Sequence, residues 1–114
     1  DMVGHTAIKD AIVLAMEALD AVLGEVVCAA IGKDVSTLIT ADHGNADEIN
    51  NPITGKPNTQ HSLNPVPCIV VDNNRTWEIV NHSGGLSNIA PTLLTLMDIE
   101  KPKEMTASSL IKKS

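Results

Sequence analysis

The sequence predicts an α/β domain built on a parallel sheet. A long stretch with helical periodicity is followed at once by a short β-branched segment, and further short apolar segments recur later in the chain. A helix, a tight turn and a strand form half of a parallel α/β unit. The 114 residues are enough for one domain of this kind.

The first element is a predicted helix over residues 7–31. Lys9, Asp10, Glu17 and other charged side chains fall mostly off its apolar stripe, and Gly32 supplies the stop. The apolar residues recur at steps of three and four, the period of one helix face. They are Ile8, Ile12, Ala15, Met16, Leu19, Val22, Leu23, Val26 and Ala30.

Three short apolar segments are predicted as strands, over residues 35–40, 66–71 and 76–80. Residues 44–66 are rich in Gly, Asn, Asp and Pro without periodicity, which predicts a long irregular connection. Loops of that length inside a domain are usually functional.

Two more helices are predicted towards the end of the chain. After Gly84-Gly85, Ser87 is expected to cap a helix that contains Pro91 and ends near Met97. The tail over residues 104–113 is expected to add a short final helix.

Composition excludes several functions. The formal charge is −6, which disfavours a partner bound through its phosphates, so we expect no nucleic acid. Trp77 is the only aromatic residue, so the core must be aliphatic and bases have no stacking platform. No apolar run approaches the roughly 18 residues of a membrane span. We therefore expect a cytoplasmic protein that contacts no membrane.

The two cysteines, Cys28 and Cys68, lie in apolar runs. Free cysteine is among the most buried residue types, so we expect two buried, reduced thiols. A disulfide scaffold would need more cysteines in a chain of this length.

Candidate metal ligands follow the predicted segments. Asp42 and His43 come directly after a strand, where ligands bind in open α/β sheets. Asp1 and His5 are four residues apart and can hold one ion between them, and His61 lies in the long connection. Carboxylate and imidazole together suit Mn²⁺, Zn²⁺ or Fe²⁺.

Taken together, these five residues indicate a metal site more strongly than any one of them does alone. A parallel sheet would bring their segment ends to one edge, placing two carboxylates and three imidazoles within reach of each other. That is the ligand set of a two-metal phosphate site. The fourth histidine, His82, lies in a polar turn and is interpreted as an ordinary turn residue.

Four motifs carry a resemblance to a known family. They are residues 1–6 (DMVGHT), 40–47 (TADHGNAD), 61–67 (HSLNPVP) and 84–92 (GGLSNIAPT). In this order they resemble the last part of cofactor-independent phosphoglycerate mutases, members of the alkaline phosphatase superfamily. The resemblance covers essentially the whole chain and continues through residues 101–106.

The resemblance implies an enzyme that interconverts 3-phosphoglycerate and 2-phosphoglycerate in glycolysis and gluconeogenesis, through a phosphoserine. It implies two Mn²⁺ ions, which Mg²⁺, Zn²⁺ or Co²⁺ replace in some members. By motif, Asp1, His5 and His61 would bind one metal. Asp42 with His43 would help to bind the other.

Parts of the family pattern have no counterpart in residues 1–114. These are the nucleophilic serine, a further metal-binding aspartate, and the substrate domain with its Arg and Lys contacts. We therefore expect residues 1–114 to be one partial domain, the C-terminal segment of the phosphatase-like domain, and to be inactive alone without a catalytic residue of its own. Its expected partners are the missing segments, phosphoglycerate in the complete enzyme, and a second copy through unpaired strand edges. Ala7 stands where the family usually has Gly.

Two alternatives remain open. Phosphopentomutase and other hydrolases of the same superfamily share the Asp-His-Gly-Asn turn and the later histidine, although residues 64–67 and 84–92 favour phosphoglycerate mutase. A metal-binding or assembly module without catalysis is the alternative from a different class, and the absent nucleophile favours it for the isolated chain.

Overall fold

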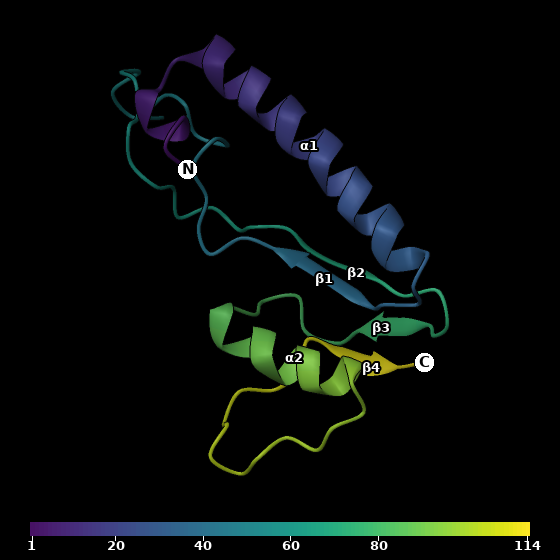
Figure 1. Cartoon of the computed structure of the whole chain (residues 1–114). Coiled ribbons are helices and arrows are strands. Elements are labelled where there is room, and N and C mark those ends of the chain that lie inside the picture. The colour runs from purple at the N-terminus through teal and green to yellow at the C-terminus, as the bar shows by residue number, and fades with distance from the viewer.

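The computed structural model describes residues 1–114, which form two two-stranded sheets with one helix beside each (Figure 1). The elements in chain order are η1 (Gly4–Thr6), α1 (Lys9–Ile31), β1 (Thr37–Thr40), β2 (Cys68–Val71), β3 (Trp77–Ile79), η2 (Leu86–Asn88), α2 (Ile89–Leu96) and β4 (Ile111–Lys113). The predicted α/β class is therefore confirmed.

Both strand pairs are antiparallel, whereas the sequence predicted parallel pairing. In the first pair Thr37 lies opposite Val71 and Thr40 opposite Cys68. Parallel neighbours need a crossover, usually through a helix. The connection between β1 and β2 contains no helix and returns at the same end of the pair, so the strands run in opposite directions.

The tail forms a strand and not the predicted helix. Residues 104–110 contain no helix, and β4 pairs with β3 so that Ile111 lies opposite Ile79. Short helices are marginal in water. Here pairing with β3 buries both Leu110 and Ile111, and this packing outweighs the local preference.

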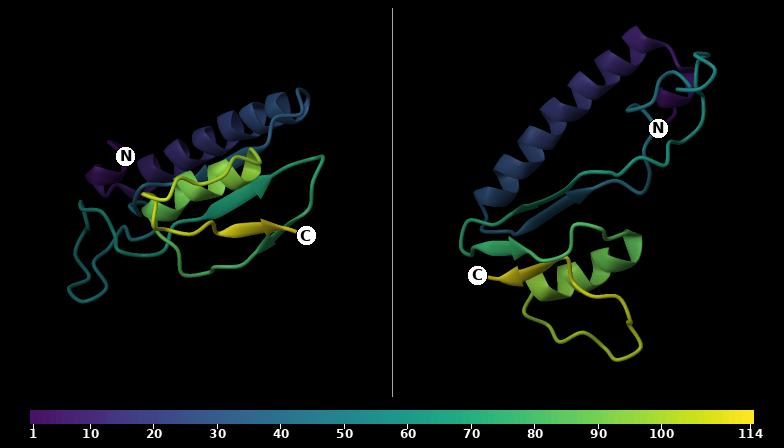
Figure 2. Two further views of the ribbon diagram at one scale, coloured as in Figure 1. Left: turned by 90° about the horizontal axis from the view of Figure 1, so that it is seen from below. Right: turned by 180° about the vertical axis from the view of Figure 1, so that it is seen from behind.

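The helix α1 starts two residues after its predicted start and ends at Ile31, with Gly32 as its C-cap. Figure 1 and the right view of Figure 2 show it on the outer side of the β1–β2 pair, away from α2. Only Ile12 is buried along its length, and Met16, Leu19, Val22 and Val26 of its apolar stripe are exposed. None of the helices combines the length and apolar character needed to cross a bilayer.

The main core lies between α2 and the β3–β4 pair. Leu96, Leu110 and Ile111 are buried there. The fully buried Thr92 links α2 to β4, because its Oγ1 donates to Asn88 O (2.7 Å) and accepts from Leu110 N (2.9 Å).

Two local predictions were wrong. Asn88, not Ser87, is the N-cap of α2, and the chain enters this helix through η2, which contains Ser87. Cys28 and Cys68 are free but exposed. Cys28 is exposed near the C-terminal end of α1, and Cys68 lines the cleft described below.

Candidate metal centre

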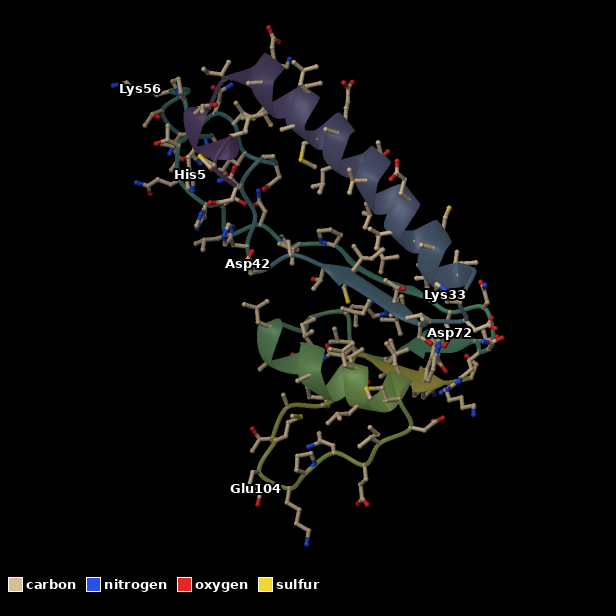
Figure 3. All side chains as sticks on the ribbon, in the orientation of Figure 1. His5, Lys33, Asp42, Lys56, Asp72 and Glu104 are labelled. Atoms are coloured by element: carbon tan, nitrogen blue, oxygen red, sulfur yellow. The ribbon has the colours of Figure 1, made fainter.

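The predicted ligands gather at one end of the molecule. The turn η1 carries His5, and Asp1 lies just before it, with His5 N donating to Asp1 O (3.2 Å). The end of β1 leads into Asp42 and His43, and the long connection returns to bring in His61. Figure 3 shows His5 and Asp42 at this end of the molecule, while Asp72 lies at the other end of the β1–β2 pair.

Asp1, His5 and His61 form a compact cluster. The Nε2 atom of His5 lies 3.2 Å from Asp1 Oδ2, and the Nε2 atom of His61 lies 3.2 Å from Asp1 Oδ1. The two Nε2 atoms are 3.2 Å apart. One ligand atom from each residue therefore fits within 4.8 Å, a grouping able to hold a metal ion.

Asp42 and His43 lie beside this cluster. The Nε2 atom of His43 is 3.8 Å from Asp1 Oδ1 and 3.6 Å from Asp42 Oδ1. The His43 ring stacks on that of His61, with centroids 3.5 Å apart and planes at 14°. All five predicted residues thus meet in one region. His82 lies outside the cluster, in the lining of the neighbouring cleft.

Backbone carbonyls orient two of the imidazoles. The Nδ1 atoms of His5 and His43 lie 2.6 Å from Thr59 O and 3.2 Å from Gly44 O. A carbonyl only accepts, so Nδ1 carries the proton in each bond, and in the neutral ring Nε2 keeps a free lone pair. Such a second contact is typical of metal-binding histidines.

Electrostatics favour a neutral imidazole at His61. Desolvation, with the nearby His43 and His5, lowers the pKa of His61 below its ordinary value. Neutral imidazole is the form that binds metals. One carboxylate and two imidazoles, with a second carboxylate and a third imidazole adjacent, fit Mn²⁺, Zn²⁺ or Co²⁺ by the nature of the donor atoms.

The turn η1 depends on close contact with the long connection. An ideal Cβ on Gly4 would collide with the Asn45 side-chain oxygen, so any other residue at this position requires the Asn45 side chain or the turn to move. Ala7 closes η1 in the left-handed region, at φ 51°, which explains why glycine suits that position.

A cleft of about 910 Å³ lies next to the cluster, and Asp42 and His43 are among its lining residues. Side chains from both sheets line it, among them Val70, Trp77 and Ile111. The cluster therefore opens towards a space between the two sheets.

Sequence reasoning missed two groups near the cluster. One is the carbonyl of Thr59, which no side-chain pattern can reveal. The other is Asp47, whose carboxylate accepts hydrogen bonds from Ser62 and Asn64. These two bonds, the largest contributions, lower the pKa of Asp47. In the sequence Asp47 is the last residue of the motif 40–47, and nothing in that motif assigns it a role.

The fold and the cluster define a class of protein. The profile of the Metalloenzyme superfamily matches residues 1–101, so the chain belongs to the metalloenzyme superfamily. The alkaline-phosphatase-like fold expected from the sequence is therefore confirmed.

The relatives within this class are named 2,3-bisphosphoglycerate-independent phosphoglycerate mutase. Those of Symbiobacterium thermophilum and Vesicomyosocius okutanii are 48% and 50% identical over 111 residues. The matches cover 97% of this chain and 21% or 22% of the relatives. The chain thus spans about a fifth of their length, and its resemblance to this family is confirmed.

A solved structure of a phosphoglycerate mutase has a similar fold. Leishmania mexicana phosphoglycerate mutase, crystallised at low cobalt concentration, matches with a TM-score of 0.84 and 30% identity. The match covers 100% of this chain and 23% of the solved chain.

Proposed function

We propose that residues 1–114 contribute part of the metal centre of a cofactor-independent phosphoglycerate mutase that interconverts 3-phosphoglycerate and 2-phosphoglycerate. The observation that carries the proposal is the cluster of Asp1, His5 and His61, whose ligand atoms lie within 4.8 Å of one another. In this role the three residues bind one divalent cation, and Asp42 with His43 helps to bind a second. Mn²⁺ is the proposed ion, with Mg²⁺, Zn²⁺ or Co²⁺ as substitutes.

When bound, two such cations neutralise charge on a transferring phosphoryl group and make a serine hydroxyl easier to ionise. The residues of this chain place and orient the ligand atoms. Asp1 has a carboxylate oxygen near each imidazole of the cluster, and the Thr59 carbonyl holds His5 with Nε2 free. Stacking on His43 restricts the rotation of the His61 ring.

The nucleophile belongs, in this proposal, to another part of the longer protein. Ser62 is the serine next to a cluster residue, but it is 6% exposed and its Oγ donates to Asp47 Oδ2 at 2.7 Å. In this proposal the buried Ser62 hydroxyl has a structural role, as a donor to Asp47. Residues 1–114 are accordingly proposed as the C-terminal segment of a phosphatase-like domain, inactive without the other segments and the substrate domain.

The proposed role belongs to glycolysis and gluconeogenesis in the cytoplasm. The names of the relatives support the mutase over phosphopentomutase or another hydrolase. A metal-binding module without catalysis is the competing outcome. Mixing the chain with a polypeptide that carries the other segments, in the presence of Mn²⁺, should restore mutase activity. Metal binding without activity in that mixture would support the module.

Calorimetric titration with Mn²⁺ tests the ligand assignment. His61→Ala should weaken binding at least 10-fold, because it removes one of three clustered ligands. His82→Ala is the matched control and should bind Mn²⁺ as the unchanged chain does. A larger effect from His82→Ala would refute the assignment. The chain alone should also bind more weakly than the whole enzyme, and two tight sites in the chain alone would contradict this.

A further inference from the structure

The segments that follow His43 and His61 are tied together by one carboxylate. Asp47 Oδ2 accepts from Ser62 Oγ at 2.7 Å and from Asn64 Nδ2 at 2.6 Å. Its other oxygen, Oδ1, accepts from Asn45 N at 2.7 Å. Asp47 thus joins both ends of the long connection through both of its oxygens.

The same two segments also meet through their backbones. Ser62 N donates to Gly44 O at 3.0 Å, and these two residues form an isolated antiparallel bridge. A Cβ on Gly44 would collide with Ser62 Oγ and lie 2.8 Å from Asp47 Oδ1. Ser62 is 6% exposed and is the buried polar residue of this region.

Each bridged residue follows an imidazole directly. Gly44 comes after His43 and Ser62 comes after His61, so a shift at the bridge moves both rings. The rings stack with centroids 3.5 Å apart, a spacing that leaves little tolerance for such a shift.

We propose that Asp47 is a positioning residue of the metal centre, which fixes the spacing of His43 and His61 by holding Ser62 and Asn64. The inference rests on the proposed function, since it assigns these histidines to metal binding. Asp47 is not among the clustered ligands and acts only through the two loop segments. Contacts that orient ligands in this way are typically worth 10- to 100-fold in metal affinity.

Asp47→Asn is the sharpest variant because it keeps the shape of the side chain. Both carboxylate oxygens of Asp47 accept hydrogen bonds, so an amide must turn its NH₂ towards a donor on one side. Asn64→Leu removes one donor and leaves the carboxylate, and it should act in the same direction with a smaller effect.

Asp72→Asn is the matched control. Asp72 also accepts several bonds, from Trp77 Nε1 (2.9 Å) and Ser36 Oγ (3.0 Å) among others. It lies at the opposite end of the β1–β2 pair from Asp42 (Figure 3). Its loss should lower stability without changing the metal centre.

The experiment combines Mn²⁺ titration with histidine ring NMR of the metal-free protein. Asp47→Asn should weaken Mn²⁺ binding 10- to 100-fold and shift the ring signals of His43 and His61. Asp72→Asn should do neither. Unchanged affinity and unchanged ring signals in Asp47→Asn would overturn the inference, and Asn64→Leu supplies the same readouts if Asp47→Asn fails to fold.

The outcomes also separate this inference from the proposed function. If His61→Ala weakens Mn²⁺ binding and Asp47→Asn does not, only the positioning role fails. If the unchanged chain binds no Mn²⁺, the proposed function fails, while the ring signals still decide whether Asp47 sets the spacing of the two histidines.

Discussion

Gly4 lies against the side chain of Asn45 so closely that a Cβ would collide with the Asn45 oxygen. This contact seats the turn that carries Asp1 and His5 on the loop that follows His43. The two halves of the candidate metal centre are thus assembled by direct packing between segments that are remote in sequence.

Gly4→Ala should push η1 away from the loop and weaken Mn²⁺ binding by at least 10-fold, because Asp1 and His5 move together. Gly24→Ala is the control, since a Cβ on Gly24 meets nothing within 4 Å. In the middle of α1, that change should stabilise the chain by about 0.5–1 kcal/mol. Equal Mn²⁺ affinities of Gly4→Ala and the unchanged chain, measured by calorimetry, would refute the packing argument.

Ala7→Gly should stabilise the protein. The left-handed backbone at Ala7 costs an L-residue roughly 1–2 kcal/mol. The greater freedom of glycine in the unfolded chain offsets about 0.4–1 kcal/mol of this. We expect a net gain of about 1 kcal/mol in the free energy of unfolding, measured with urea. Ala15→Gly, inside α1, should instead lose about 1 kcal/mol. Destabilisation by both variants would contradict the prediction.

Thr92→Val tests the buried link between α2 and β4. Valine keeps the shape of threonine but removes the oxygen that accepts from Leu110 N. An unsatisfied buried N–H costs about 1–3 kcal/mol, which a shift in the urea midpoint should report. Thr95→Val is the control, because Thr95 Oγ1 only donates, to Pro91 O at 3.0 Å. A smaller loss in Thr92→Val than in Thr95→Val would show that this link contributes little.

Acid should remove the contribution of Asp72 to stability. The hydrogen bond from Trp77, with others from Asn74 and Ser36, lowers the pKa of Asp72 below the ordinary 3.8. The stabilisation is therefore complete above pH 3.8 and is lost as the pH falls through the lower folded value. At pH 7, Asp72→Asn should have a lower melting temperature than the unchanged chain. The difference between the two melting temperatures should shrink below pH 3.8. A difference in melting temperature that stays constant down to pH 2 would contradict this assignment.

Self-association should increase with concentration. Each sheet has only two strands, so each has outer edges without a strand partner. Exposed edges pair readily with other chains. Sedimentation velocity over a range of concentrations should show a rising fraction of dimers, whereas a monomer at every concentration would exclude this pairing.

Local patterns predicted the local elements well. The helical period placed α1 within two residues of its start and at its observed end, because a long amphipathic helix is encoded in its own residues. The strand formed by Thr37–Thr40 was predicted two residues too long for the same local reasons.

The wrong predictions concern contacts between distant residues. The direction of β2 against β1 depends on how the long connection folds, which no short window contains. Ile111 pairs with a strand more than thirty positions earlier, so the tail looked helical only when taken alone. Cys68 lies in an apolar run, but the cleft leaves it exposed.

Some residues of the candidate site were predicted from the sequence, and one was not. Asp1, His5 and His61 were predicted from residue type and motif, and they lie together in the structure, although their binding of a metal stays a prediction. Asp47 was not predicted because its role exists only through Ser62 and Asn64, which reach it across the fold.

The connection between Gly44 and Asn64 receives the first turn of the chain at Asn45 and Thr59 and supplies His61 as well. Its length therefore determines where the segment that carries Asp1 and His5 is held. A change in the length of this connection would therefore displace residues 1–7. Insertions or deletions in the connection should survive in evolution only with matching changes in those residues.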